Sequence, residues 1–204
     1  MNLRRPLHLL LLTGFAGALA GFLVARMLSQ KSIVLQAGTW LPQPRAVAPF
    51  QITDLEGHSF GNPALLGHPS LLFFGYSNCP DVCPTTLATI QSALRRSPVA
   101  GLRVLFVTID PERDTPAALE PYLRAFGRGV VGLYGSTAAL MPLERSLGAL
   151  AERREGPAGS YRFEHSATLY LLDAQGRMAA VFTPPISAAA LGADLSTLAQ
   201  ASIL

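Results

Sequence analysis

Both cysteines of this 204-residue chain lie in one short stretch, LLFFGYSNCPDVCPTTL, as Cys79 and Cys83. An apolar run typical of a buried strand ends at Gly75 just before them, and a helix is expected to open at Pro84. Cysteines at a helix N-terminus are favoured as thiolates, the form that binds metals and attacks disulfides. The pair could therefore hold a soft metal ion, act as a redox dithiol, or close as a structural disulfide. Three intervening residues leave a wider loop than the two of a typical thioredoxin motif, which favours the metal site.

A metal site needs more than two thiolates, and four histidines are available to supply a third ligand. Three are poorly placed: His8 in the N-terminal apolar segment, His58 in an expected turn, and His68 at the far end of the strand that leads to the cysteines. His165 follows a polar loop and precedes a hairpin, so it can fold over the cysteine pair, although a surface histidine is the common alternative. Two sulfurs and one nitrogen suit copper, as Cu(I) or Cu(II), better than zinc, which would lack a fourth ligand.

The segments around the cysteines alternate between strand and helix patterns. Strands of the buried type are expected over Ser70–Ser77 and Leu102–Asp110. Helices are expected over Thr85–Arg96, from Thr115 onward, and over Ser187–Gln200, with a weaker strand and helix before the last of them. Such alternation predicts a mainly parallel sheet with helices on both faces.

Two hairpins complete the expected layout. Phe50–Phe60 alternates apolar and polar residues around Glu56-Gly57, and Ala167–Phe182 holds two alternating runs that meet at Asp173-Ala174-Gln175-Gly176. The segment Glu152–Ser160 is expected to be a polar loop. The sequence thus predicts an α/β protein with a thioredoxin-like fold, an N-terminal hairpin extension and an antiparallel hairpin at one sheet edge. Sites in open α/β sheets form beyond the carboxyl ends of strands, which is where the cysteines fall.

The N-terminus has the character of a membrane segment. An apolar stretch of about 18 residues, Leu7–Val24, follows Arg4 and Arg5 and is just long enough to cross a bilayer as one transmembrane helix. The positive charges favour a cytoplasmic N-terminus and a domain that faces the periplasm, at the inner membrane. A cleaved signal peptide is the alternative, since Ala18-Leu19-Ala20 resembles a cleavage site, but apolar residues continue beyond it. The expected organisation is an anchor at 1–30, a proline-containing linker without regular structure at 31–49, and a domain at 50–204.

Composition limits the classes of function. Half of the residues are hydrophobic and only 14% are charged, so a packed domain is expected. The formal net charge of +3 is spread along the chain, with no basic block and no aromatic residues interleaved with basic ones. This pattern argues against a nucleic-acid partner.

Three motifs occur in the order GYSNCPDVCPTTL, FVTIDPERDTP and FEHSATLYLLDAQGRM. In order and spacing they resemble the SCO/SenC family of membrane-anchored copper proteins, and the similarity runs from about Phe50 to Leu198. The resemblance implies a thioredoxin-like fold and copper bound by Cys79, Cys83 and His165. It also implies assembly of the dinuclear copper centre in subunit II of cytochrome c oxidase, with that subunit as partner and another copper chaperone as donor.

Asp110 and Asp114 in DPERDT match the acidic motif of that family, near the copper but not among its ligands. Asp110 ends a strand at the edge that carries the cysteines, so we expect it to orient a ligand or a protein partner. For Asp114 the stronger expectation is a cap, together with Thr115, on the following helix. Two features depart from the family pattern and could alter partner docking: the short basic loop at Arg153-Arg154 and the Pro184-Pro185 pair.

The leading hypothesis is a membrane-anchored copper chaperone, which binds copper through two cysteines and one histidine and needs no catalytic turnover. The enzymatic alternative is a thiol-disulfide oxidoreductase, in which Cys79 and Cys83 reduce the copper-ligand cysteines of the target. A redox or copper sensor and, less favoured, a peroxidase are further alternatives. His165 discriminates among them, because dithiol exchange has no evident need for an imidazole.

Overall fold

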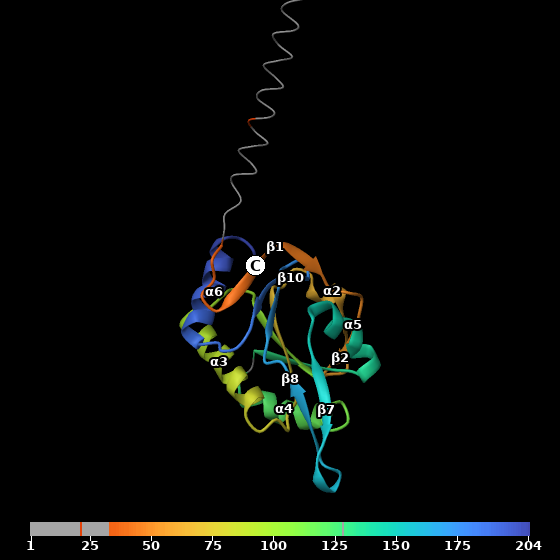
Figure 1. Cartoon of the computed structure of the whole chain (residues 1–204). Helices are drawn as coiled ribbons and strands as arrows, with labels where there is room; N and C mark the ends of the chain where they lie inside the picture. Colours follow the sequence, from red (N-terminus) through yellow and green to blue (C-terminus); the bar gives the residue numbers. More distant parts are fainter. Residues whose placement is uncertain (1–20, 22–32, 128) are drawn as a thin grey trace, which may run out of the picture. The chain divides into compact units, whose positions relative to one another are not determined.

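The computed structural model describes Gly21 and residues 33–127 and 129–204. Residues 34–204 form one compact unit, which carries the whole sheet (Figure 1). The expected membrane anchor at residues 1–30 lies outside the described residues, Gly21 apart. Among the helices that are described, none is long and apolar enough to cross a membrane.

The main sheet has eight strands in the order β1-β10-β9-β4-β5-β6-β2-β3. Strands β4, β5 and β6 are parallel and form its centre, while the remaining neighbours pair antiparallel. All six residues of β4 are buried, which explains why its sequence, SLLFFG, is apolar throughout rather than alternating. The strands are β1 (Gly38–Ala46), β2 (Gln51–Asp54), β3 (Ser59–Gly61), β4 (Ser70–Gly75), β5 (Arg103–Thr108), β6 (Val130–Tyr134), β9 (Leu169–Leu172) and β10 (Arg177–Phe182).

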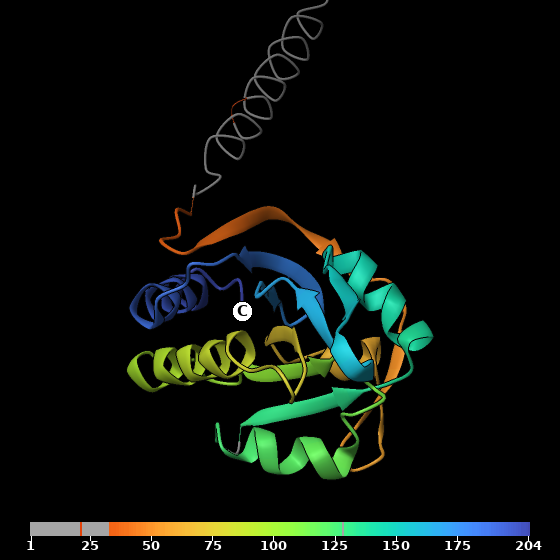
Figure 2. The ribbon, with the colours of Figure 1, turned by 60° about the horizontal axis from the view of Figure 1, so that its bottom comes forward.

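Helices lie on opposite sides of this sheet. Helices α3 and α6 pack side by side, and α5 lies on the other side of the strands in both views (Figures 1 and 2). Helix α4 packs against β6. Helix α6 begins where Ser187 Oγ accepts a hydrogen bond of 3.1 Å from the Ala190 amide, which satisfies one of its free N-terminal donors. The helices are α2 (Asn62–Leu65), α3 (Val82–Arg96), α4 (Pro116–Arg124), α5 (Thr137–Leu147) and α6 (Ala188–Gln200).

The sheet departs from the expected layout on one side. The segment expected to be an irregular linker contains strand β1, which pairs antiparallel with β10. As a result the hairpin β9–β10 lies inside the sheet, between β1 and β4, and not at its edge. The sheet is therefore mixed, where the sequence predicted a mainly parallel one. The N-terminal hairpin β2–β3 is confirmed, with Gly57 at a φ of 89° in its turn.

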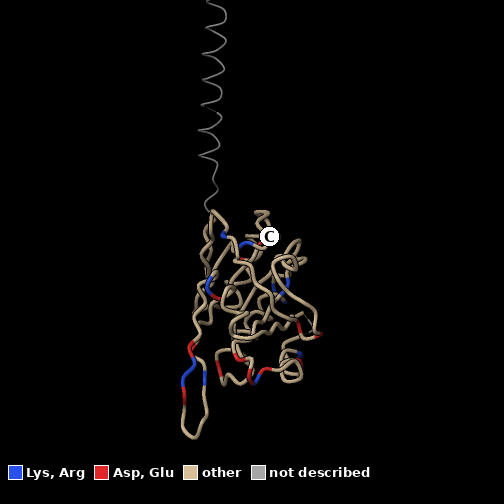
Figure 3. Tube along the Cα trace, turned by 90° about the vertical axis from the view of Figure 1, so that its right-hand side faces the viewer, with Lys and Arg blue, Asp and Glu red and all other residues tan. Residues whose placement is uncertain are grey.

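A second, two-stranded sheet replaces the polar loop expected at Glu152–Ser160. Strands β7 (Ala151–Glu155) and β8 (Tyr161–His165) form a hairpin that projects from the domain (Figures 1 and 3). All five residues of β7 are exposed, so its sequence lacks the apolar alternation that marks a half-buried strand. Acidic and basic residues follow one another along the hairpin, and Arg154 pairs across it with Glu164 at 3.1 Å.

Candidate metal centre

The structure brings the three expected ligands together. The ligand atoms of Cys79, Cys83 and His165 all lie within 4.8 Å of one another, and Cys83 Sγ is 3.2 Å from His165 Nε2. They come from the loop after β4, the first turn of α3 and the end of β8. A group of this size can close around one soft metal ion. His58, which the sequence analysis set aside, is exposed in the β2–β3 turn.

Helix α3 starts two residues earlier than the sequence indicated, at Val82 rather than at Pro84. This start places Cys83 in the first turn, where its backbone amide has no partner within the helix. That amide donates to Cys79 Sγ at 3.4 Å, so the sulfur of Cys79 sits against the positive end of the helix. Cys79 is half-buried at this position, so a partner can reach its sulfur.

Cys83 differs from Cys79 in its burial. Its side chain is 0% exposed, and burial raises the pKa of its thiol well above the ordinary value. Cys83 Sγ lies 3.2 Å from His165 Nε2, and burial favours the protonated thiol. A metal ion bound here would displace that proton.

His165 presents the nitrogen that a metal needs. Its Nδ1 lies 3.1 Å from the carbonyl oxygen of Ser166, and because a carbonyl can only accept, Nδ1 carries the proton. The lone pair is then on Nε2, which faces Cys83. Burial lowers the pKa of His165, and the rings of Phe73 and Tyr76 lie 6.0 and 5.9 Å from the imidazole. The imidazole is thus held neutral and oriented in the way that metal-ligating histidines are.

Gly75 makes room for the Cys83 sulfur. A Cβ at this position would lie 3.0 Å from Cys83 Sγ and 2.8 Å from the ring of Phe106. We therefore expect Gly75→Ala to lower the free energy of unfolding by about 1–3 kcal/mol, because an overpacked core must shift its side chains. Urea denaturation measures the change. Gly129→Ala is the control, since nothing lies within 4 Å of a Cβ there; equal stability of the two variants would mean that the pocket behind Cys83 is loose.

The sequence suggested that Asp114 caps helix α4, but the structure gives Asp114 a different role. Thr115 is the N-cap residue and makes no side-chain capping bond. Asp114 is instead fully buried and accepts hydrogen bonds from the Ser77 amide at 3.0 Å, from the Ser77 hydroxyl, and from Thr108 Oγ1 at 2.6 Å. The carboxylate thus ties the end of β5 to the loop that enters the cysteine pair.

Asp110 contacts the strand that carries His165. It is 1% exposed and accepts hydrogen bonds from Arg113 Nε and, at 2.9 Å, from the hydroxyl of Tyr161. Burial and this hydrogen bond raise the pKa of Tyr161 to about 12, so its hydroxyl remains a donor. Tyr161 is the first residue of β8, and His165 is the last. Asp110 is thereby fastened to the strand that carries the imidazole.

Four residues in these contacts were not found from the sequence: Ser77, Thr108, Arg113 and Tyr161. Ser77 and Thr108 carried a weak signal, because each is a hydroxyl residue at the end of an apolar run. Arg113 lies inside the DPERDT motif, where only the acidic residues were considered. Tyr161 carried no signal, because its partners depend on a hairpin that the sequence did not reveal.

The fold and the site define a thioredoxin-like domain that presents two thiols and an imidazole beside the carboxyl ends of parallel strands. The chain belongs to the SCO1/SenC family, whose model matches residues 40–200. A relative described as a copper-binding protein, from Stutzerimonas stutzeri, is 32% identical over 189 residues, which cover 91% of this chain and 89% of that one.

Solved structures agree with this assignment. Copper-bound ScoI of Bradyrhizobium japonicum is 37% identical with a TM-score of 0.66, covering 74% of this chain and 98% of that one. BsSco, described as a member of the Sco family of cytochrome c oxidase assembly proteins, shares the fold at 22% identity and a TM-score of 0.63, covering 81% of this chain and 98% of that one.

Proposed function

We propose that this protein is a copper chaperone that holds its cargo through Cys79, Cys83 and His165. The observation that carries the proposal is the imidazole nitrogen 3.2 Å from the buried Cys83 sulfur, in a chain related to a copper-bound ScoI. Two thiolates suit Cu(I), and the imidazole extends the site to Cu(II). The proposed acceptor is the dinuclear copper centre in subunit II of cytochrome c oxidase, with another copper chaperone as the donor.

The proposed setting is the inner membrane. Residues 1–30 would anchor the protein as a single transmembrane helix, and the domain would face the periplasm. Tethering holds the domain close to a membrane-bound acceptor, which raises the effective concentration of one near the other.

The site suits transfer by exchange of ligands. Cys79 is half-exposed and lies in a hollow with Pro80, Val82 and Phe163, so a thiolate of the acceptor can approach copper from that side. Cys83 is fully buried and would release the ion last. Copper would thus pass between thiolates without entering water as a free ion. Most of the surface that lines the hollow is apolar, and the charged residues Asp81, Arg162 and Glu164 also line it.

A second candidate function is thiol-disulfide exchange, favoured by the hydrogen bond from the Cys83 amide to Cys79 Sγ. The Cys79 thiolate would attack a disulfide in the target, and Cys83 would resolve the mixed disulfide. Two target cysteines would be reduced as the pair Cys79–Cys83 became oxidised. This chemistry does not use His165, which distinguishes it from copper binding.

Titration of Cu(I) into the reduced full chain, in a mild detergent and without oxygen, tests the proposal against a competing chromophoric chelator. We expect one equivalent of tightly bound copper and an affinity at least about tenfold lower in His165→Ala, roughly 1.4 kcal/mol. His58→Ala is the matched control and should bind as the wild type does, since His58 is exposed in a turn. If His165→Ala also binds like the wild type, the three-ligand site is wrong, and the exchange of thiols and disulfides becomes the leading function.

A further inference from the structure

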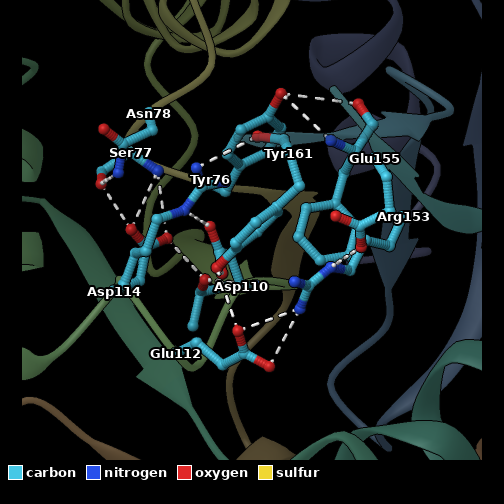
Figure 4. Close-up of polar contacts among 12 residues, drawn as sticks. Tyr76, Ser77, Asn78, Asp110, Glu112, Asp114, Arg153, Glu155 and Tyr161 are labelled. Atoms are coloured by element: carbon cyan, nitrogen blue, oxygen red, sulfur yellow. Dashed lines mark hydrogen bonds and ion pairs between the residues drawn. The ribbon is translucent and has the colours of Figure 1, made fainter. Parts of the chain in front are cut away.

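Tyr161 is held between two arginines. The guanidinium carbons of Arg113 and Arg153 each lie 3.7 Å from the centre of its ring, one from the β5–α4 loop and one from β7. Figure 4 shows Tyr161 together with Arg153, Asp110 and Glu112. The hydroxyl of the same ring donates to Asp110 at 2.9 Å and lies 3.3 Å from Glu112. Both faces and the polar end of one side chain are therefore engaged. We call these five residues the tyrosine clamp.

The clamp joins the projecting hairpin to the main domain. Arg153, on β7, donates to Glu112 at 2.9 Å and to Glu155 at 2.8 Å. Arg113, on the domain, donates to the backbone oxygen of Tyr161 at 3.1 Å and also binds Asp110. Each arginine thus stacks on the tyrosine and is itself held by hydrogen bonds, so neither is free to swing away.

Strand β8 connects the clamp to the metal ligand. Side chains of a strand alternate between its faces, so Tyr161, Phe163 and His165 point to the same side, and all three are half-buried. The rings of Tyr161 and Phe163 are 5.9 Å apart. Tyr76 lies 5.6 Å from Phe163 and 5.9 Å from His165. A continuous column of rings therefore runs from the clamp to the imidazole, over about 13 Å of strand.

Strand β7 adds little hydrophobic contact between the projecting hairpin and the main domain. All five residues of β7 are exposed, so burial of that strand contributes no hydrophobic stabilisation. What holds the hairpin against the domain is the inward face of β8, the hydrogen bonds of 3.5 and 3.4 Å between the Tyr76 hydroxyl and the backbone of Phe163, and the clamp. A change at the clamp should therefore move the whole strand, including the end that carries His165.

We propose that Tyr161, held between Arg113 and Arg153, is a positioning residue that keeps His165 against Cys83 and so sets how long the third ligand stays on copper. The inference rests on the proposed function and deepens it. Tyr161 and its arginines do not touch the metal; they act through the strand.

Single substitutions can distinguish how much each contact of the clamp contributes. Tyr161→Ala removes both stacking contacts and should speed Cu(I) transfer to a chelator about tenfold, while Arg153→Gln removes one and should speed it about threefold. Tyr161→Phe keeps the stacked ring and should stay within about twofold of the wild type. Arg154→Gln is the matched control: Arg154 is the next residue of β7, and its ion pairs are with Glu152 and Glu164.

Two measurements on the full chain in detergent show whether the effect passes through His165. The first is the rate of Cu(I) transfer in a His165→Ala background, where Tyr161→Ala should have no further effect, as in a double-mutant cycle. The second needs no copper: the ¹⁵N chemical shifts of the His165 ring in the reduced protein. We expect a fixed Nδ1–H tautomer in the wild type, in Tyr161→Phe and in Arg154→Gln, and a mixture of tautomers in Tyr161→Ala.

The outcomes distinguish the inference from the proposed function. An additional rate increase from Tyr161→Ala in the His165→Ala background, or an unchanged His165 spectrum in Tyr161→Ala, would overturn the positioning role while copper binding stood. Equal rates for Arg153→Gln and Arg154→Gln would also overturn it. If the wild type bound no copper but Tyr161→Ala still lost the His165 tautomer, the chaperone function would fail and the positioning of His165 would be upheld.

Discussion

Replacing Cys83 with serine is expected to lower the affinity of the protein for Cu(I) by about a hundred- to a thousandfold. Zinc sites with four ligands gain roughly 10–16 kcal/mol from binding, so one ligand is worth about 2.5–4 kcal/mol, or about a hundred- to a thousandfold. A serine hydroxyl is a hard ligand that does not replace a thiolate for a soft ion. Because Cys83 is 0% exposed, water has no access to the vacated position either. Competition with a Cu(I) chelator measures the loss.

The matching substitution, Cys79→Ser, should cost about ten- to a hundredfold. Cys79 is half-buried on a loop, so water or a neighbouring group can take its place at the metal. Circular dichroism and urea denaturation check that both variants fold, since a buried serine costs about 1–3 kcal/mol on its own. Equal losses of affinity at the two cysteines, in variants that fold equally well, would contradict the division into an outer and an inner thiolate.

The chemistry of the site could be predicted because its residues depend on local patterns. The apolar run to Gly75 and the helical spacing after Pro84 place the cysteines at the start of a helix, whatever the rest of the chain does. Elimination among four histidines left His165 as a candidate, and the resemblance to the SCO/SenC family implied that it is a ligand. The structure brings its Nε2 within 3.2 Å of Cys83 Sγ. The helix boundary was wrong by two residues, since nothing in the sequence prevents the turn Val82-Cys83-Pro84 from being helical: proline is tolerated in a first turn.

Strand β1 could not be predicted, because its prolines are typical of linkers. Pro42 and Pro44 lie where the register with β10 shifts, between Trp40 and Arg45. Proline has no amide hydrogen, so it is tolerated at an edge strand with such an irregularity. The pairing partner is more than a hundred residues away, and no local pattern announces it. Without β1, the hairpin β9–β10 could only be placed at the edge of the sheet.

The β7–β8 hairpin and the role of Asp114 were missed for a related reason. Strand β7 is exposed along its whole length and is held by charged pairs and the clamp, so it produces no hydrophobic period in the sequence; only the short strand β8 alternates. Asp114 sits directly before a helix, so a cap is the ordinary local expectation, but its buried partners at Ser77 and Thr108 satisfy the carboxylate more completely. Both the position of the hairpin and the role of Asp114 depend on contacts between segments that are distant in the sequence.

Asp114→Ala is expected to lower the free energy of unfolding by about 3 kcal/mol, the largest loss of stability among the substitutions considered. The carboxylate is 0% exposed and accepts from the Ser77 amide, the Ser77 hydroxyl and Thr108 Oγ1. Hydrogen bonds to a charged group are worth roughly 1.5–3 kcal/mol, and its removal leaves donors without partners. Urea denaturation of the reduced, copper-free protein measures the change.

The same substitution should weaken Cu(I) binding by about tenfold in the protein that remains folded, because Ser77 fixes the loop that leads to Cys79 and a loosened ligand must be ordered on binding. Asp114→Asn keeps one acceptor oxygen and should lose about half as much stability. Glu120→Ala, at an exposed ion pair with Arg124 on α4, should change stability by less than about 0.5 kcal/mol. If Asp114→Ala proved as stable as Glu120→Ala, the loop before the cysteines would be held by its own backbone, and Asp114 would have no part in placing the outer thiolate.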